Sequence, residues 1–377
     1  MRTNTSLVRD GLLPRFVFLP YWVMRLVLAP FVLFRRRRKE QGDGVSTTLC
    51  IEAGVPGWKS IEFKEIYSSA CEYLGADRVI KLEIDKNESY LRQVRTAFDQ
   101  VRPSHYVYDP RTGSPKWHVG LAQAMRISLM CQLRGIVPVA LLTDFSDRYF
   151  RALSAIVTAN RGVVITFLSA KAGSPIFPHR RLVGPCLMPL SKASLASLDT
   201  LRDTQPALSS RKASFVGALY EPRTAVLRSI EEQLRVRGFT LDIRGRVFGA
   251  PRMPDEEYWS ILCHSAVVVT TSEQIELPIL DWKWIKQLTY RYVEATAAGT
   301  LLVAPEVPGV RRYFVPGEHF VSFASPADAA EVIEYYLTNE SERARIAEQG
   351  RRRAHALVHA NSFWVGVDIG LGKDSLT

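Results

Sequence analysis

Cysteine is scarce in this sequence, and no two of its five cysteines are closely spaced. They stand at positions 50, 71, 131, 186 and 263 of 377 residues. This spacing matches neither a zinc motif nor a redox motif, and an odd, sparse set predicts a reducing compartment without a disulfide framework. The seven histidines form no HExxH motif and no tight cluster with cysteine. We therefore expect no metal held by these motifs. A resident cofactor is not expected either.

The sequence also lacks any strong compositional bias. It is 47% hydrophobic and 23% charged, with 21 prolines and 23 glycines, which excludes collagen-like, low-complexity and wholly disordered chains. Its net charge of +11 is unevenly distributed, because residues 1–44 carry +6 and leave only +5 for the other 333 residues. A body this mildly basic argues against a dedicated nucleic-acid binder. The length allows two or three domains.

One apolar run stands near the amino terminus. Residues 16–34 contain a single charge, Arg25, and two prolines, and the run RRRRK follows at 35–39. A spanning helix needs about 20 apolar residues. Basic residues on both sides place both flanks in the cytoplasm, which favours a segment that dips into the bilayer or lies along it over one that crosses it. A true span and a buried helix are the alternatives. The expected membrane contacts are Trp22, Arg25, Arg35, Arg36, Arg37 and Arg38, with anionic lipid as the partner.

After a linker at 40–44, strand and helix patterns alternate. Strands are expected at 46–54, 78–84, 105–109, 137–144 and 163–168, and in the second half at 213–219, 239–245, 266–272, 300–306 and 319–325. Helical patterns separate them, as in right-handed βαβ units. The predicted fold is α/β, with two Rossmann-like, doubly wound domains facing a cleft. The predicted limits are 1–44 for the membrane segment and linker, 45–205 and 206–357 for the two domains, and 358–377 for a C-terminal tail.

Three segments of the second half carry a family resemblance. They are FVGALYEPRTAVL (215–227), MPDEEYWSILCHSAVVVTTS (253–272) and QLTYRYVEATAAGTLLVAPEVPGVRRYFVPGEHFVSF (287–323). Together they resemble the C-terminal domain of GT-B glycosyltransferases of group 1, closest to the spore-maturation-like family. The resemblance covers about residues 213–357 and implies a nucleotide-diphosphate sugar as co-substrate.

The same segments supply the candidate donor-site residues. A strand that runs into Gly217 lets backbone amides approach a diphosphate, and Arg223 opens the next helix. The resemblance implies that Glu294 binds the ribose hydroxyls of a sugar nucleotide, and that Arg291 or a neighbouring cation neutralises the leaving diphosphate. Related retaining enzymes carry a second glutamate where this chain has Gln287, which leaves the stereochemistry open. Outside these segments, Arg244 flanks Gly245 at the end of an expected strand and is a further donor-site candidate. Taken singly, Arg223 and Arg244 could be solvated, and the pair Arg291–Glu294 could be a surface ion pair.

The first half offers candidates for the base that activates the acceptor. Glu52 lies in a strand-to-helix loop with Gly54, Gly57, Trp58 and Lys59, and Asp144 ends an apolar strand. Both are predicted catalytic residues, since an inverting enzyme needs a base for the acceptor hydroxyl. The alternatives are that Glu52 pairs with a nearby lysine and that Asp144 caps a helix. Further cleft candidates are His105, Asp109 and His118, and a loop with Trp282, Lys283, Trp284 and Lys286 is either a second interfacial contact, part of the base pocket or simple packing.

These observations predict a glycosyltransferase at the cytoplasmic face of the plasma membrane. It would move a sugar from a nucleotide-diphosphate sugar to a lipid-linked saccharide or a surface polysaccharide. A nucleotide-sugar epimerase and a membrane-tethered scaffold with a decayed donor site are the alternatives, and Gln287 is the feature that favours the scaffold. The donor base, the sugar, the linkage and the oligomeric state stay open.

Overall fold

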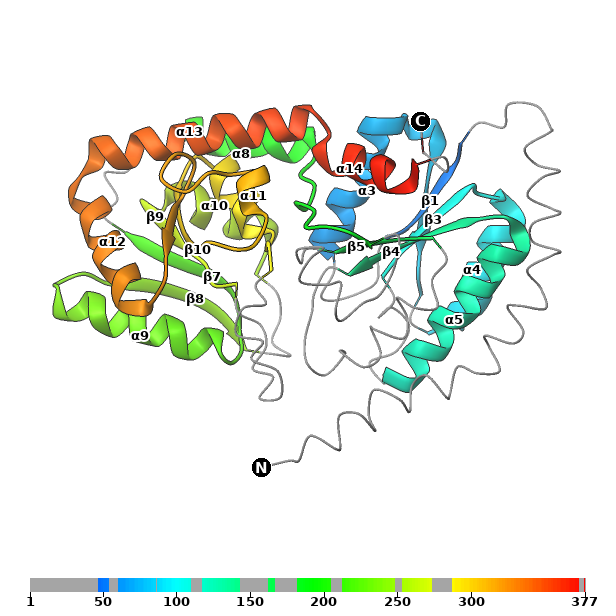
Figure 1. Cartoon of the computed structure of the whole chain (residues 1–377), viewed down its shortest axis with the longest axis horizontal. Coiled ribbons are helices and arrows are strands. Elements are labelled where there is room, and N and C mark those ends of the chain that lie inside the picture. Colours follow the sequence, from blue (N-terminus) through cyan, green and yellow to red (C-terminus); the bar gives the residue numbers. More distant parts are fainter. Residues whose placement is uncertain are drawn as a thin grey trace.

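The computed structural model describes residues 47–53, 60–85, 87–109, 117–142, 162–166, 182–204, 212–247, 253–272, 287–372 and 376. These residues form two parallel sheets covered by helices (Figure 1). The predicted α/β class with two Rossmann-like units is therefore confirmed. The predicted membrane segment, residues 1–44, lies outside the described residues. Within the described part of the chain, no helix combines the length and the apolar character that crossing a bilayer requires.

The first sheet has the strand order β2-β1-β3-β4-β5-β6, and its neighbouring strands are parallel. The strands are β1 Leu49–Ala53, β2 Val79–Glu83, β3 His105–Tyr108, β4 Val137–Leu142, β5 Val163–Thr166 and β6 Leu182–Val183. The helices are α3 Ser60–Leu74, α4 Tyr90–Val101 and α5 Trp117–Arg134, with a short 3-10 turn at Ala76–Arg78. Residues of β1, β3 and β4 are fully buried, as expected for strands covered on both faces of a parallel sheet.

The second sheet has the order β11-β10-β9-β7-β8 and is also parallel. Its strands are β7 Ala213–Leu219, β8 Leu241–Val247, β9 Val267–Val269, β10 Leu301–Pro305 and β11 Val321–Phe323. Its helices are α9 Arg223–Val236, α10 Asp255–His264, α11 Arg291–Ala297, α12 Pro326–Thr338 and α13 Glu340–His359, with a 3-10 turn at Val310–Arg312. One apolar core lies between the sheet and α9 and α12, and another lies on the face that α10, α11 and α13 cover (Figure 1).

The chain crosses between the two sheets at residues 186–191. Cys186 and Met188 are buried in the core of the first sheet, whereas Leu187 and Leu190 are buried in a core of the second. Helix α8, Lys192–Thr204, follows and packs on the second sheet's side. Neighbouring side chains thus point into opposite cores, which ties the connection to both halves.

Two carboxylates of α3 hold the start of α8. Glu65 accepts hydrogen bonds from the backbone N–H of Ser191 at 2.7 Å and from the Ser194 hydroxyl at 2.6 Å, and Glu72 accepts from the N–H of Lys192 at 2.8 Å. The first amides of a helix have no partner within the helix and carry partial positive charge, so carboxylates stabilise them. A helix of the first half is therefore linked by polar contacts to a helix that packs on the second.

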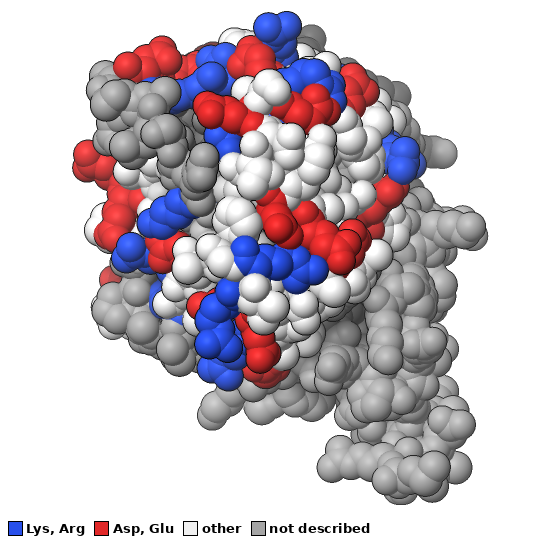
Figure 2. All heavy atoms as spheres, turned by 90° about the vertical axis from the view of Figure 1, so that its left-hand side faces the viewer, with Lys and Arg blue, Asp and Glu red and all other residues white. Residues whose placement is uncertain are grey.

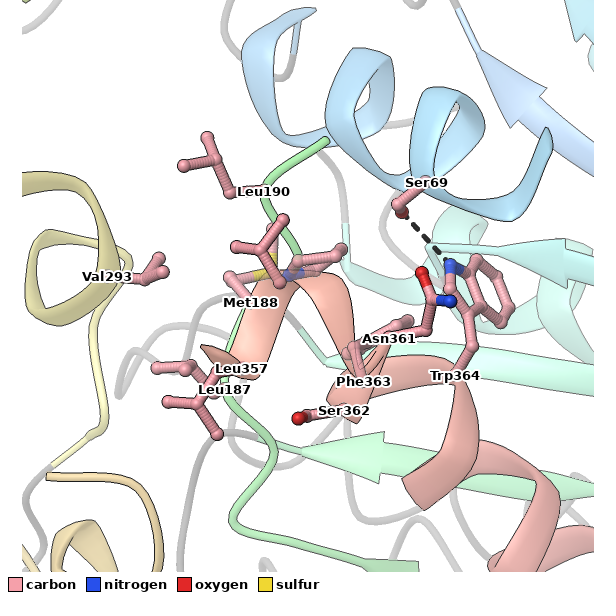
Figure 3. A pocket seen from close by; sticks show the side chains of 12 residues that line it. Ser69, Leu187, Met188, Leu190, Val293, Leu357, Asn361, Ser362, Phe363 and Trp364 are labelled. Atoms are coloured by element: carbon pink, nitrogen blue, oxygen red, sulfur yellow. Dashed lines mark hydrogen bonds between the residues drawn. The ribbon is translucent and has the colours of Figure 1, made fainter. Parts of the chain in front are cut away.

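The chain crosses back at the end of α13. Residues 362–371, which the sequence analysis included in a tail, form helix α14 (Ser362–Leu371), and its Phe363, Trp364 and Val367 are buried in the core of the first sheet. The Trp364 indole N–H donates to the Ser69 hydroxyl at 3.0 Å. Figure 3 shows a small pocket where the two crossings run side by side, lined from both halves of the chain. The predicted domain limits stay predictions.

The face of the second domain that points away from the first has mixed charges. Figure 2 shows basic and acidic side chains interspersed on it. The ion pairs of this domain include Arg237 with Glu334 at 3.1 Å. A surface of alternating sign does not present the continuous positive potential that a polyanion binds.

Candidate functional site

Four of the predicted donor-site residues meet where β7 and β9 end and α11 begins. In a doubly wound sheet, ligands bind outside the carboxyl ends of the strands. Gly217 lies in the carboxyl-terminal half of β7, Arg223 opens α9, and Arg291 and Glu294 lie on the first turn of α11. The structure brings these four residues together.

Gly217 adopts a backbone conformation that favours glycine. Its φ is +151°, and a Cβ there would lie 3.3 Å from Phe215 Cζ and 3.7 Å from Arg291 Nη2. Residues other than glycine rarely adopt this φ. Glycine at this position therefore allows the β7 backbone to take this conformation beside the Arg291 guanidinium.

Arg291 and Glu294 form a buried pair with a third member, Tyr258 of α10. Arg291 Nη1 lies 3.3 Å from Glu294 Oε2, and the two side chains are 11% and 3% exposed. The Tyr258 hydroxyl donates to Glu294 Oε2 at 2.6 Å and accepts a hydrogen bond from Arg291 Nη1. Arg291 Nη2 donates to the carbonyl of Val216 at 2.6 Å. The alternative of a solvated surface ion pair is therefore wrong for these two residues.

In the triad of Arg291, Tyr258 and Glu294, the surroundings favour a neutral phenol and a charged guanidinium. Burial raises the pKa of Tyr258 well above its usual 10, so the phenol stays protonated. Burial lowers the pKa of Arg291, but its neighbours Tyr258 and Glu294 raise it, and the net shift is upward. The guanidinium therefore stays charged. Arg291 and Tyr258 together can hold the Glu294 carboxylate in one orientation.

Arg223 is held at the ends of two strands. Its Nε donates to the Thr271 hydroxyl at 3.1 Å, and its Nη1 donates to the carbonyl of Ala218 at 3.0 Å. The guanidinium lies 4.3 Å from the centre of the Tyr220 ring, and the residue is only 9% exposed. The alternative of a solvated arginine is wrong, and Arg223 is a positioned cation at the strand ends.

Arg244 and Gln287 are placed differently. Arg244 lies on the edge strand β8, is about half exposed and pairs with Asp242 at 3.0 Å. Hydrogen bonds to Lys212 and Arg244 outweigh the effect of burial and lower the pKa of Asp242. Gln287 is buried, and its backbone N–H donates to the carbonyl of Ser272, three residues beyond β9. In the described structure the Arg244 side chain is thus engaged along its own strand, whereas the Gln287 backbone is bonded to the segment that follows β9.

Glu52 is buried at the carboxyl end of β1. Its Oε1 accepts a hydrogen bond from the Tyr106 hydroxyl at 2.5 Å and another from the Tyr90 hydroxyl. Burial, followed by the charge of Glu52, raises the pKa of both tyrosines well above 10, so both remain donors. Two phenols thus donate to Oε1 of Glu52, and the alternative of a lysine partner stays a prediction.

The other candidates of the first half are only partly described. Asp109 directly follows β3 and is fully buried, and His105 Nδ1 lies 2.9 Å from the Ser104 hydroxyl. The remaining candidates lie outside the described residues or have undescribed side chains: Gly54, Gly57, Trp58, Lys59, His118, Asp144, Trp282, Lys283, Trp284 and Lys286. Within the described residues, no group of three or more histidine, cysteine or acidic side chains is arranged to hold a metal ion.

Sequence reasoning missed Tyr258. It stands in the segment 253–272 that supports the family resemblance, but 36 positions separate it from Glu294. No spacing rule connects a residue of one helix to a residue of a later helix across a strand. Only the packing of α10 beside α11 shows the contact.

Known proteins resemble this chain in part of its sequence and in its fold. A family model described as glycosyl transferase-like matches residues 223–362. Among solved structures, HepE from Anabaena in complex with UDP and glucose is 12% identical, with a TM-score of 0.53 over 84% of this chain and 97% of that one. Sucrose-phosphate synthase from Thermosynechococcus elongatus is 12% identical, with a TM-score of 0.51 over 87% and 98%. At these identities the likeness shows the fold. No curated protein sequence matches significantly.

Proposed function

We propose that this chain, a GT-B glycosyltransferase of group 1, transfers a sugar from a nucleoside-diphosphate sugar to an acceptor at the membrane. The observation that carries this proposal is the contact of Arg291, Tyr258 and the buried Glu294 near Gly217. These three contacting side chains lie inside the segment that matches the glycosyl transferase-like family. A carboxylate buried among fixed donors at strand ends suits a ligand with hydroxyl groups. HepE from Anabaena, which has the same fold, forms a complex with UDP-glucose, and this supports a nucleotide sugar as the donor.

Different donor-site residues bind the ribose and the diphosphate. Glu294 accepts hydrogen bonds from the ribose hydroxyls. Arg223 stabilises the charge that develops on the departing diphosphate, together with backbone amides near Gly217. The glycosidic carbon loses its bond to the diphosphate oxygen and gains one to the acceptor oxygen, whose proton goes to a base. Gln287 stays a predicted contact of the donor sugar.

The base belongs to the first domain, and Glu52 and Asp144 remain its candidates. Glu52 lies near the carboxyl end of β1, and two phenols donate hydrogen bonds to its Oε1. The strand end places it at the edge of the sheet where ligands bind. If Glu52 is the base, the acceptor hydroxyl has to approach a carboxylate that already accepts hydrogen bonds from Tyr90 and Tyr106.

The amino-terminal segment supports the proposal of an acceptor at the membrane. Residues 16–34 are apolar, and Arg35–Lys39 are basic. A polybasic run gains roughly 1 kcal/mol per residue near anionic lipid. We therefore place the protein on the cytoplasmic face of the membrane, where a lipid-linked saccharide or a growing surface polysaccharide is within reach.

The transfer reaction is tested by supplying UDP-, GDP-, ADP-, CDP- and TDP-sugars with and without a membrane lipid extract. The expected result is release of one nucleoside diphosphate, increased by the extract, with the sugar recovered on lipid. Conversion of a nucleotide sugar into an isomer without transfer would support an epimerase in its place. A folded protein that binds these nucleotides and transfers nothing would support the scaffold.

Membrane attachment is tested by sedimentation with vesicles of phosphatidylcholine alone or with roughly one-third phosphatidylglycerol. Replacing Arg35, Arg36, Arg37 and Arg38 with glutamine is expected to lower binding to the anionic vesicles by more than about tenfold. The matched control replaces four arginines of the described domains: Arg92, Arg95, Arg126 and Arg228. Equal losses in the two variants would mean that overall charge and not the basic run causes binding.

A further inference from the structure

We propose that Tyr258 is a positioning residue for the donor site: with Arg291 it fixes the orientation of the Glu294 carboxylate, and so sets how strongly the site selects a ribose. This inference rests on the proposed function. Tyr258 comes from a different helix, α10, and touches Glu294 through its hydroxyl. Its role is to act through Glu294 and not on the nucleotide itself.

The directions of the hydrogen bonds are fixed by chemistry. A guanidinium only donates, an ionised carboxylate only accepts, and a phenol has a single hydrogen to donate. Because Tyr258 lies between Arg291 Nη1 and Glu294 Oε2, its hydrogen must go to Glu294 and its lone pair must accept from Arg291. The chain Arg291, Tyr258, Glu294 therefore has one arrangement of donors, which holds Oε2 in place.

Arg291 anchors this chain to the strand that approaches the ligand. Its second nitrogen, Nη2, donates to the Val216 carbonyl at 2.6 Å, one residue before Gly217. Its guanidinium carbon also lies 4.9 Å from the centre of the Tyr258 ring. One side chain thus links β7, α10 and α11. With both terminal nitrogens engaged in this way, Arg291 supports the site.

Burial makes the arrangement rigid. The side chains of Arg291 and Glu294 are 11% and 3% exposed, and Tyr258 packs edge-on against Trp259 at a ring separation of 5.3 Å. Water cannot readily replace the phenol as a donor at such a site. Two neighbouring ribose hydroxyls bind well only to a carboxylate turned toward both, so loss of the phenol lets the carboxylate rotate and weakens this recognition.

The experiment is calorimetric titration of the full chain with UDP, GDP, ADP and CDP, each beside its 2′,3′-dideoxy analogue. The wild type is expected to bind one ribonucleotide more tightly than its dideoxy form. In Tyr258→Phe, affinity for that ribonucleotide is expected to fall about five- to tenfold, while affinity for the dideoxy analogue stays unchanged. The matched control is Tyr292→Phe, which removes a buried hydroxyl of α11 that donates to the Pro305 carbonyl and not to Glu294.

The outcomes separate this inference from the proposed function. If the wild type binds no nucleotide, the proposed function fails, and this inference fails with it. If the wild type discriminates and Tyr258→Phe discriminates equally, or loses both ligands in parallel, the positioning role is overturned and the donor site stands. Should Tyr258→Phe not fold, Arg291→Lys gives the same test, because lysine keeps the charge but cannot bridge Val216 and Tyr258.

Discussion

Replacing Glu294 with glutamine is expected to weaken binding of the nucleoside diphosphate by roughly 30- to 150-fold. The amide keeps the shape of the side chain but loses the charge that strengthens its hydrogen bonds to hydroxyl groups. Hydrogen bonds to charged groups contribute about 2–3 kcal/mol, and each 1.4 kcal/mol is a factor of ten in affinity. Glu294 is only 3% exposed, so bulk water does not compensate. Calorimetric titration with the ribonucleotide that the wild type binds measures the change.

The matched control for this change is Glu306→Gln. Glu306 pairs with Arg311 at the end of β10 but is exposed and lies outside the donor triad. Its substitution is expected to leave nucleotide affinity unchanged. An affinity in Glu294→Gln within threefold of the wild type would contradict the assignment of Glu294 to the ribose.

Replacing Arg291 with leucine is expected to lower the free energy of unfolding by about 3–5 kcal/mol. Removing one partner of a buried ion pair leaves an uncompensated charge. The substitution also removes the hydrogen bonds that Arg291 donates to the Tyr258 hydroxyl and to the Val216 carbonyl. Thermal and guanidinium chloride unfolding measure the loss. The matched control is Arg345→Leu, which breaks the pair Glu342–Arg345 at the same spacing on the exposed face of α13 and is expected to change stability little.

A second substitution distinguishes a lost ion pair from simple loss of packing. Adding Glu294→Met to Arg291→Leu removes the unpaired carboxylate, and apolar replacements of a whole buried pair are often neutral. The double variant is therefore expected to recover part of the stability while nucleotide binding stays lost. Equal losses in Arg291→Leu and Arg345→Leu would show that burial of the Arg291 pair has no energetic consequence.

Much of the fold follows from the periodicity of the sequence. Continuous apolar runs such as VPVALL and TLLVAP correspond to the buried strands β4 and β10, and the glycines after helical patterns mark helix ends. Helix α14 was missed because its apolar character, seen alone, does not reveal which core it joins. Phe363 and Trp364 pack against strands that lie some 200 residues or more earlier in the chain, and such a contact has no local signal.

The donor site could be predicted in part for a similar reason. Arg291 and Glu294 stand three residues apart on one helix, so their contact is a local property of the sequence. Whether that pair is buried, and that Tyr258 joins it, depends on how α10 packs beside α11. For Arg244 the local pattern was misleading. Its position beside Gly245 suggested a donor contact, but on the edge strand β8 its side chain bonds to Asp242, two residues away.

The most direct test of a nucleotide-sugar site in the second domain is titration of the wild-type chain with UDP, GDP, ADP, CDP and TDP. Saturable binding of one of them, raising the melting temperature with concentration and sharply reduced in Glu294→Gln, is the result expected here. Binding of none of these diphosphates by a well-folded wild type would contradict the donor site, and with it the transferase reaction.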